Sequence, residues 1–174
     1  MRKMTVVIVG LFILVLAGCG YTTRASNVPF KTIYIDKFTN NIIFTAESKR
    51  NVYLPLLEVD VRDAIIDRFQ FDGNVRISKP DLAEAILKGE LSGYDRDGLR
   101  YDDNDDVEEY RVRISVKLEL INPSTDAVIW RESGFSGEAT YFLSGPNASS
   151  EESAVDDAIK DLSRRIVERT IESW

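Results

Sequence analysis

The segment from residue 110 to residue 120 sets the strongest limit on the fold, because apolar and polar residues alternate there without a break. Successive side chains of a β-strand point to opposite faces of the sheet. One face of this strand therefore packs, and the other meets solvent or a partner. The packing row is Tyr110, Val112, Ile114, Val116, Leu118 and Leu120. Such one-sided strands are typical of antiparallel sheets, whose apolar face needs a covering layer.

A first amphipathic helix is predicted over residues 55–73. Apolar residues recur there every four positions among charged side chains, which is close to the helical period. The recurring residues are Leu57, Val61, Ile65 and Phe69. Pro55 suits the first turn of this helix, and Asp72-Gly73 ends it.

A second helix is predicted over residues 149–173. Ser149 and Glu152 have the spacing of a capping box, in which Ser149 would accept the third helical amide. Acidic residues lie early and arginines late, which suits the helix dipole. The residues expected to face inward are Val155, Ala158, Ile159, Leu162, Ile166 and Thr170.

Shorter β-prone stretches complete the sheet. They lie at residues 32–36, 75–77, 85–94 and 127–141, the last one broken, with a helical turn at 81–83. Gly89 and Gly93 read as close-approach or bulge positions, and residues 95–108 read as a long loop that forms an exposed hairpin tip. We therefore predict an α+β domain: a mostly antiparallel four- to five-stranded sheet with two amphipathic helices packed on one face.

The N-terminus has the layout of a secretory signal. Arg2 and Lys3 precede an uncharged stretch, residues 4–17, that ends at Gly18 and Cys19. A helix over this stretch would be about 21 Å long, whereas a hydrocarbon core is about 30 Å thick. We therefore expect residues 1–18 to be a cleaved signal peptide rather than a spanning anchor.

Cys19 is the only cysteine, so no intramolecular disulfide is possible. Residues 16–19, Leu-Ala-Gly-Cys, resemble the lipobox of bacterial lipoproteins, which implies that Cys19 carries lipid. The alternative is a simple membrane anchor with an incidental cysteine. We expect residues 19–29 to be a lipidated tether and residues 30–174 a single periplasmic domain. In such lipoproteins a residue other than Asp after the cysteine permits transfer to the outer membrane, and Gly20 fits.

The chain contains no histidine, which removes Ser-His and Cys-His nucleophile pairs and histidine-ligated zinc. No Gly-rich phosphate loop occurs either. We predict no catalytic residue and no cofactor; a glycan hydrolase that uses two carboxylates is the remaining enzymatic alternative. The formal net charge of −7 gives no basic field for nucleic-acid binding.

The acidic run at residues 102–106 begins like a calcium-binding EF-hand loop. However, its sixth position is Val107 instead of Gly, and its twelfth is Arg113 instead of Glu. No metal site is predicted. The run reads as a solvated tip, with a weak divalent-cation contact as the alternative.

Three basic residues, Arg111, Arg113 and Lys117, share the polar face of the alternating strand. Alternate positions lie about 7 Å apart, a spacing that could meet phosphates or sugar acids. We name these residues as candidate ligand-binding residues. The competing and favoured interpretation is cross-strand pairing with Glu90, Glu132 or Glu138, because surface ion pairs are common.

Several segments, taken in order, resemble one family, the lipopolysaccharide-assembly lipoproteins (LptE-like). They are Cys19-Gly20-Tyr21, residues 33–40, residues 83–91 with Tyr94, the strand to Leu120, residues 128–130, residues 137–141, and a last helix with Ile166-Val167 that closes on Trp174. The ordered set is specific, although no single motif is.

The resemblance implies an outer-membrane lipoprotein on the periplasmic face. Such a protein sits inside and against the β-barrel LptD, helps the barrel to assemble, and contacts lipopolysaccharide on its way to the outer leaflet, without catalysis. The alternative is another outer-membrane-tethered adaptor or binding lipoprotein of similar fold. The resemblance does not identify the ligand-contacting residues.

Overall fold

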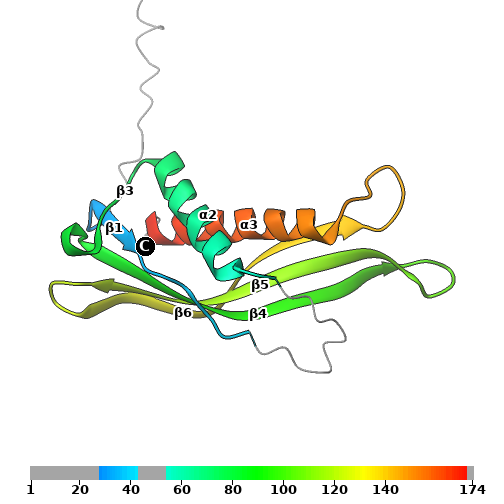
Figure 1. Ribbon diagram of the computed structural model, residues 1–174, viewed down its shortest axis with the longest axis horizontal. Coiled ribbons are helices and arrows are strands. Elements are labelled where there is room, and N and C mark those ends of the chain that lie inside the picture. The colour runs from blue at the N-terminus through cyan, green and yellow to red at the C-terminus, as the bar shows by residue number, and fades with distance from the viewer. Residues whose placement is uncertain (1–27, 43–53, 172–174) are drawn as a thin grey trace, which may run out of the picture.

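Three long antiparallel strands form most of the sheet (Figure 1). The structure is a computed structural model and describes residues 28–42 and 54–171. These strands are β4 (Ala85–Tyr101), β5 (Val107–Asn122) and β6 (Ala127–Phe142). β5 lies between the other two and pairs with both along nearly its whole length. The alternating strand is therefore the centre of the long ladder, which explains why its apolar row is so regular.

Three short strands extend the sheet on the β4 side. They are β1 (Thr32–Ile35), β2 (Thr39–Asn40) and β3 (Arg76–Ile77). β1 pairs in parallel with both β3 and β4, and β2 pairs in parallel with β4, so that the order is β3-β1-β4-β5-β6. The sheet has six strands and is antiparallel where it is longest.

Helix α3 (Glu151–Ile171) lies on the apolar face of the sheet, over β5 and β6 (Figure 1). All six residues expected to face inward are buried. The helix approaches β6 closely at Gly137, where a Cβ atom would lie 2.4 Å from the carbonyl oxygen of Ala158. A side chain at position 137 would therefore push helix and strand apart.

Helix α2 (Leu57–Asp72) lies beside α3 on the same face of the sheet and contacts β1 and β3 (Figure 1). The four residues that recur every four positions are all buried. The helix ends at Gly73, whose positive φ of 76° lets its amide donate to the carbonyl of Phe69. The prediction of two helices on one face is confirmed.

One hydrophobic core joins the elements, and it contains residues from Phe30 near the start of the described chain to Ile171 at its end. Each fully buried Leu, Ile or Phe side chain contributes about 1.5–3 kcal/mol. Gly89 belongs to this packing, because the ring of Phe38 lies where a Cβ atom would be. Gly93 lies at a register shift between β4 and β5. Both glycines have the roles predicted for them.

The hairpin tip predicted at residues 95–108 is present, but the loop is much shorter than predicted. β4 continues to Tyr101 and β5 begins at Val107, so only residues 102–106 make the turn. Asp95 pairs with Arg113 and Asp97 with Arg111 in the ladder. Cross-strand bonding to β5 therefore overrides the weak strand preference of Asp and Gly.

The predicted helix cap is also displaced by one residue. The hydroxyl of Ser150, rather than that of Ser149, accepts the amide of Ser153 at 3.1 Å. Pro55 lies before the first turn of α2, which begins at Leu57. Such shifts do not change which faces pack.

The signal peptide, Cys19 and most of the tether fall outside the described residues and stay predictions, as do the domain boundaries. Within residues 28–42 and 54–171, no helix is long and apolar enough to cross a membrane.

Candidate functional site

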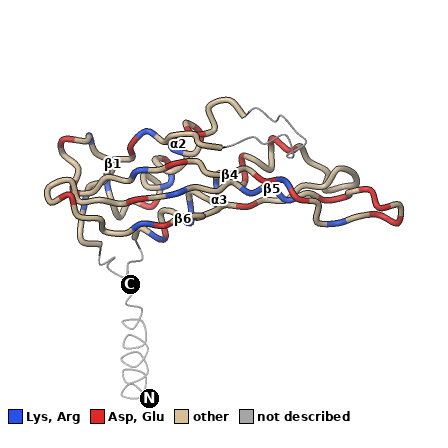
Figure 2. Tube along the Cα trace, turned by 90° about the horizontal axis from the view of Figure 1, so that it is seen from below, with Lys and Arg blue, Asp and Glu red and all other residues tan. Residues whose placement is uncertain are grey.

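The polar face of the long strands lies on the side of the sheet opposite the helices, and we call it the outer face. The alternation of β5 continues into its neighbours, so that charged residues of β4 and β6 stand beside those of β5. Its charged residues include Lys88, Glu90, Asp95, Asp97, Arg100, Glu109, Arg111, Arg113, Lys117, Glu119, Arg131 and Glu138. Acidic and basic positions are interspersed along these strands (Figure 2).

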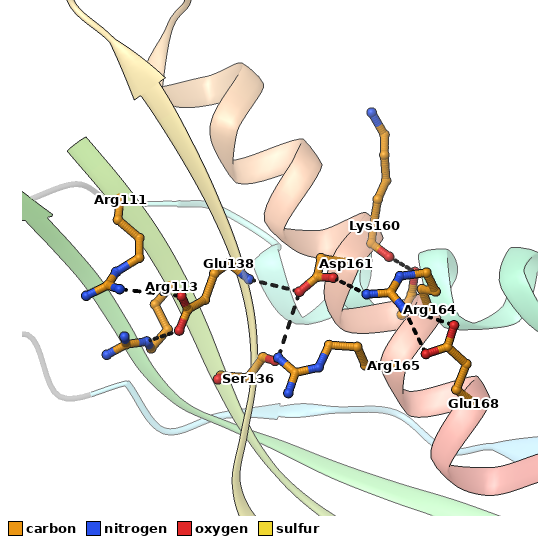
Figure 3. A network of polar contacts seen from close by, with 10 residues as sticks. Arg111, Arg113, Ser136, Glu138, Lys160, Asp161, Arg164, Arg165 and Glu168 are labelled. Atoms are coloured by element: carbon orange, nitrogen blue, oxygen red, sulfur yellow. Dashed lines mark hydrogen bonds and ion pairs between the residues drawn. The ribbon is translucent and has the colours of Figure 1, made fainter. Parts of the chain in front are cut away.

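Glu138 of β6 joins the first two candidate ligand residues (Figure 3). Its carboxylate accepts a hydrogen bond of 2.6 Å from Nε of Arg113 and lies 3.7 Å from Nη1 of Arg111. Arg111 also approaches Asp97 of β4 at 3.6 Å. Two guanidinium groups thus share two carboxylates from the flanking strands.

Lys117, the third candidate, donates a hydrogen bond of 2.7 Å to Glu90 across the β4–β5 ladder. This bond, followed by one from the side chain of Asn41, holds the pKa of the Glu90 carboxyl below its ordinary value. Arg131 and Glu119 form a further pair on the same face. The outer face is therefore a ladder of ion pairs with balanced charge.

These contacts confirm the cross-strand pairing expected for Glu90 and Glu138. Glu132 behaves differently, because it faces the helices and pairs with Arg169 of α3. The three basic residues keep exposed surface, at 30%, 31% and 54% of their side chains for Arg111, Arg113 and Lys117. Each could exchange a carboxylate for a phosphate oxygen, since guanidinium and ammonium groups form charge-assisted hydrogen bonds with both. Whether they bind a ligand stays a prediction.

Side chains of α3 cover the middle of the edge strand β6 (Figure 3). Asp161 accepts the backbone amide of Glu138 at 3.2 Å, and Arg165 donates to the carbonyl of Ser136. Arg164 holds Asp161 in place at 2.6 Å. Backbone groups that an edge strand would offer to another strand are thus occupied from within the chain.

A second polar cluster lies on the inner side of the sheet, where β4 meets the start of α3. Arg96 donates to Glu151 at 2.8 Å and to the hydroxyl of Tyr141 at 3.0 Å, while Tyr94 donates to Glu151 at 2.8 Å. The guanidinium of Arg96 also lies 3.8 Å from the ring centre of Tyr110. Burial and the bond to Glu151 raise the pKa of Tyr94.

Sequence reasoning missed this inner cluster. Arg96 lay in the predicted loop, and Glu151 was assigned only to the helix dipole. The alternation of Tyr94, Arg96 and Gly98 toward the apolar face could have indicated that β4 continues. The cluster is satisfied by its own hydrogen bonds and fixes the first turn of α3 to the sheet.

The acidic tip between β4 and β5 is organised by its own backbone. One oxygen of Asp102 accepts the amides of Asn104 and Asp106 at 2.8 and 2.9 Å, and these bonds hold the pKa of Asp102 below its ordinary value. Among the described residues, no three His, Cys, Asp or Glu side chains are placed to hold a metal ion.

Comparison with known proteins gives one family. The model of LptE, described as lipopolysaccharide-assembly, matches residues 30–170. Among curated proteins, none matches the sequence of this chain.

Three solved structures share the fold at low sequence identity. A hypothetical protein from Chlamydia trachomatis has a TM-score of 0.56 and 13% identity over 80% of this chain and 95% of its own. A protein from Xanthomonas campestris has a TM-score of 0.54 and 13% identity over 83% and 87%. A minor lipoprotein from Acinetobacter baumannii has a TM-score of 0.52 and 14% identity over 80% and 91%. At these identities the likeness concerns the fold alone.

Proposed function

This chain belongs to the lipopolysaccharide-assembly family LptE, and we propose that it is an outer-membrane lipoprotein that plugs the β-barrel LptD. In this role it helps the barrel to assemble and assists the insertion of lipopolysaccharide into the outer leaflet. The family match over residues 30–170 carries the proposal, because it includes nearly every described residue.

The outer face supports a role as a plug. The interior of a transmembrane β-barrel is polar, so a protein that fills it needs polar surfaces without unpaired charge. Arg111, Arg113 and Lys117 are each matched by a carboxylate from a neighbouring strand. A charge-balanced face of this kind can lie against a polar wall without leaving an uncompensated buried charge, which would be strongly destabilising.

Co-purification tests the barrel partnership. A tagged full-length chain, extracted from membranes in mild detergent, should bring down an outer-membrane β-barrel protein of the LptD type. Recovery of the chain alone would count against the proposal. Recovery of a soluble periplasmic protein instead would favour the alternative, an adaptor lipoprotein of similar fold.

We place the anchor at Cys19, after removal of residues 1–18. Each buried acyl methylene contributes about 0.8 kcal/mol, so two or more chains hold a protein firmly at its membrane. Mass spectrometry of the purified protein should show a lipidated Cys19 at the N-terminus. An intact Met1 or an unmodified thiol at position 19 would contradict the anchor.

The phosphates of lipopolysaccharide are the ligand that suits Arg111, Arg113 and Lys117. A phosphate that approaches the outer face can replace Glu138 or Asp97 as the partner of a guanidinium group. The cost of this exchange is small because these pairs are partly exposed. Catalysis and nucleic-acid binding form no part of this proposal.

A further inference from the structure

A groove runs between α2 and α3 on the solvent side of the helix layer, away from the outer face. Its volume is about 820 Å³, and five of its twelve lining residues are aspartates. These are Asp60, Asp63 and Asp67 of α2 and Asp156 and Asp161 of α3. The groove has an apolar component as well, since Phe71 lines it and is 81% exposed.

Two of the basic residues that line the groove are held by carboxylates of their own helix. Lys160 pairs with Asp157 at 2.8 Å, and Arg164 pairs with Asp161 and Glu168. Within the part of the chain that the structure describes, the side-chain carboxylates of Asp60, Asp67 and Asp156 form no ion pair and accept no hydrogen bond. Three carboxylates of the groove are thus open to an external cation.

The raised pKa of the Asp60 carboxyl agrees with a groove that, among the described residues, lacks a neutralising cationic side chain at this position. Burial raises this pKa, and the neighbouring charges of Asp156, Asp63 and Glu58 raise it further. Like charges that face each other across a groove repel, and a positively charged ligand would relieve that repulsion.

The spacing of the carboxylates favours an extended ligand over a single ion. Asp60 and Asp67 lie seven residues apart on one helix, or roughly 10 Å along its axis, so they cannot converge on one metal ion. Phe71 extends this row by a further turn. Arg68, the third basic residue of the groove, places its guanidinium 5.3 Å from the ring centre of Phe71, an arrangement that shows how a cationic side chain packs on this ring. Most of the ring is still exposed, at 81%.

We propose that the groove between α2 and α3 docks a lysine- or arginine-bearing segment of a partner protein. Its basic side chains meet Asp60, Asp67 and Asp156, and a further side chain packs on Phe71. The charge of the groove and its exposed aromatic ring together select this occupant. The inference goes beyond the barrel proposal and does not depend on it.

A peptide-binding experiment on the full-length chain in detergent tests the proposal. The probe is a fluorescent amphipathic peptide of Lys and Leu, about 18 residues or five helical turns long, and the control probe has Glu in place of every Lys. Fluorescence anisotropy should show binding of the Lys peptide only, with an affinity that falls as salt is added.

The chain offers a matched control for net charge. Asp60→Asn with Asp67→Asn and Asp156→Asn should weaken binding of the Lys peptide about tenfold, because three modest ion pairs multiply to that order. Asp103→Asn with Asp105→Asn and Asp106→Asn removes the same charge from the distant β4–β5 tip. This control should change binding less than about twofold.

The apolar contact has its own control pair. Phe71→Ser should weaken binding about threefold or more, whereas Leu143→Ser, at another exposed apolar residue, should leave it unchanged. Equal weakening by the groove and tip variants would overturn the proposal, since it would show attraction to net charge only. Equal binding of the Glu peptide, or Mg²⁺ binding that the groove variant abolishes, would overturn it as well.

Discussion

Arg96 of β4 and Glu151 of α3 form a half-buried ion pair of 2.8 Å, with only 11% and 22% of their side chains exposed. The pair joins the far half of the long ladder to the first turn of the last helix. The two residues are 55 positions apart in the sequence. The hydroxyl of Tyr94 bonds to Glu151, and that of Tyr141 accepts a hydrogen bond from Arg96. Removal of the ion pair should therefore affect the whole domain.

Arg96→Met should lower the free energy of unfolding by about 2–3 kcal/mol, because Glu151 loses its charged partner in a partly desolvated position. Arg131→Met is the matched control, since it breaks a pair whose arginine is 65% exposed and should cost less than about 1 kcal/mol. Urea unfolding at pH 7 measures both. Equal costs would show that the inner pair has no special role.

Alkaline pH should destabilise the protein through Tyr94. Its folded-state pKa lies above the ordinary value of 10.0, so the unfolded chain loses the phenol proton first. The stabilising contribution of the neutral phenol is complete below about pH 10 and is lost as the pH rises further.

Tyr94→Phe should flatten this decline of the free energy of unfolding above about pH 10, while costing about 1 kcal/mol at pH 7 through the lost hydrogen bond. Part of the decline should remain, because burial also raises the pKa of Tyr141. Urea midpoints from pH 7 to 11 give the comparison. Identical slopes for the two proteins would refute the assignment to Tyr94.

Gly137→Ala should destabilise the domain by about 1–3 kcal/mol, because the new Cβ would lie 2.5 Å from the backbone nitrogen of Leu162. Gly93→Ala is the control, since the nearest atom to its Cβ would be 3.5 Å away, and it should change stability by less than about 0.5 kcal/mol. Thermal unfolding of both variants is the measurement. A tolerated Gly137→Ala would mean that α3 does not press on β6 as described.

Arg111→Glu with Arg113→Glu should weaken lipopolysaccharide capture about tenfold or more, because both phosphate-directed cations become repulsive. The variant Arg111→Gln with Arg113→Gln retains side chains that pack and should show a smaller loss. Arg76→Glu with Lys79→Glu makes the same charge change at exposed positions elsewhere. The measurement is capture of lipopolysaccharide by the immobilised full-length chain, with circular dichroism to check that each variant folds. Unchanged capture would show that Arg111 and Arg113 do not bind the ligand.

The sequence predicts those parts of the fold where one residue repeat decides which face is buried. Leu57, Val61, Ile65 and Phe69 are all buried, and the apolar row of β5 is buried from Val112 to Leu120. In each case burying one face is the main source of stability. The ion pairs of Glu90 and Glu138 were also foreseeable, because cross-strand neighbours in an antiparallel pair are common partners.

The rest depends on contacts that no local pattern contains. Asp95, Asp97 and Gly98 favour turns by themselves, yet β5 holds them in a strand. The pair Arg96–Glu151 and the groove between α2 and α3 arise only when distant segments pack together. Local propensity could not reveal them, since tertiary contacts override it.

Native mass spectrometry of the complex purified through a tagged chain tests the central claim, that this protein is the plug of an LptD-type barrel. A lumen accommodates one plug, so the claim predicts a particle that contains one barrel and one copy of this chain. Detection of this chain alone, or of several copies of it without a barrel, would contradict the claim.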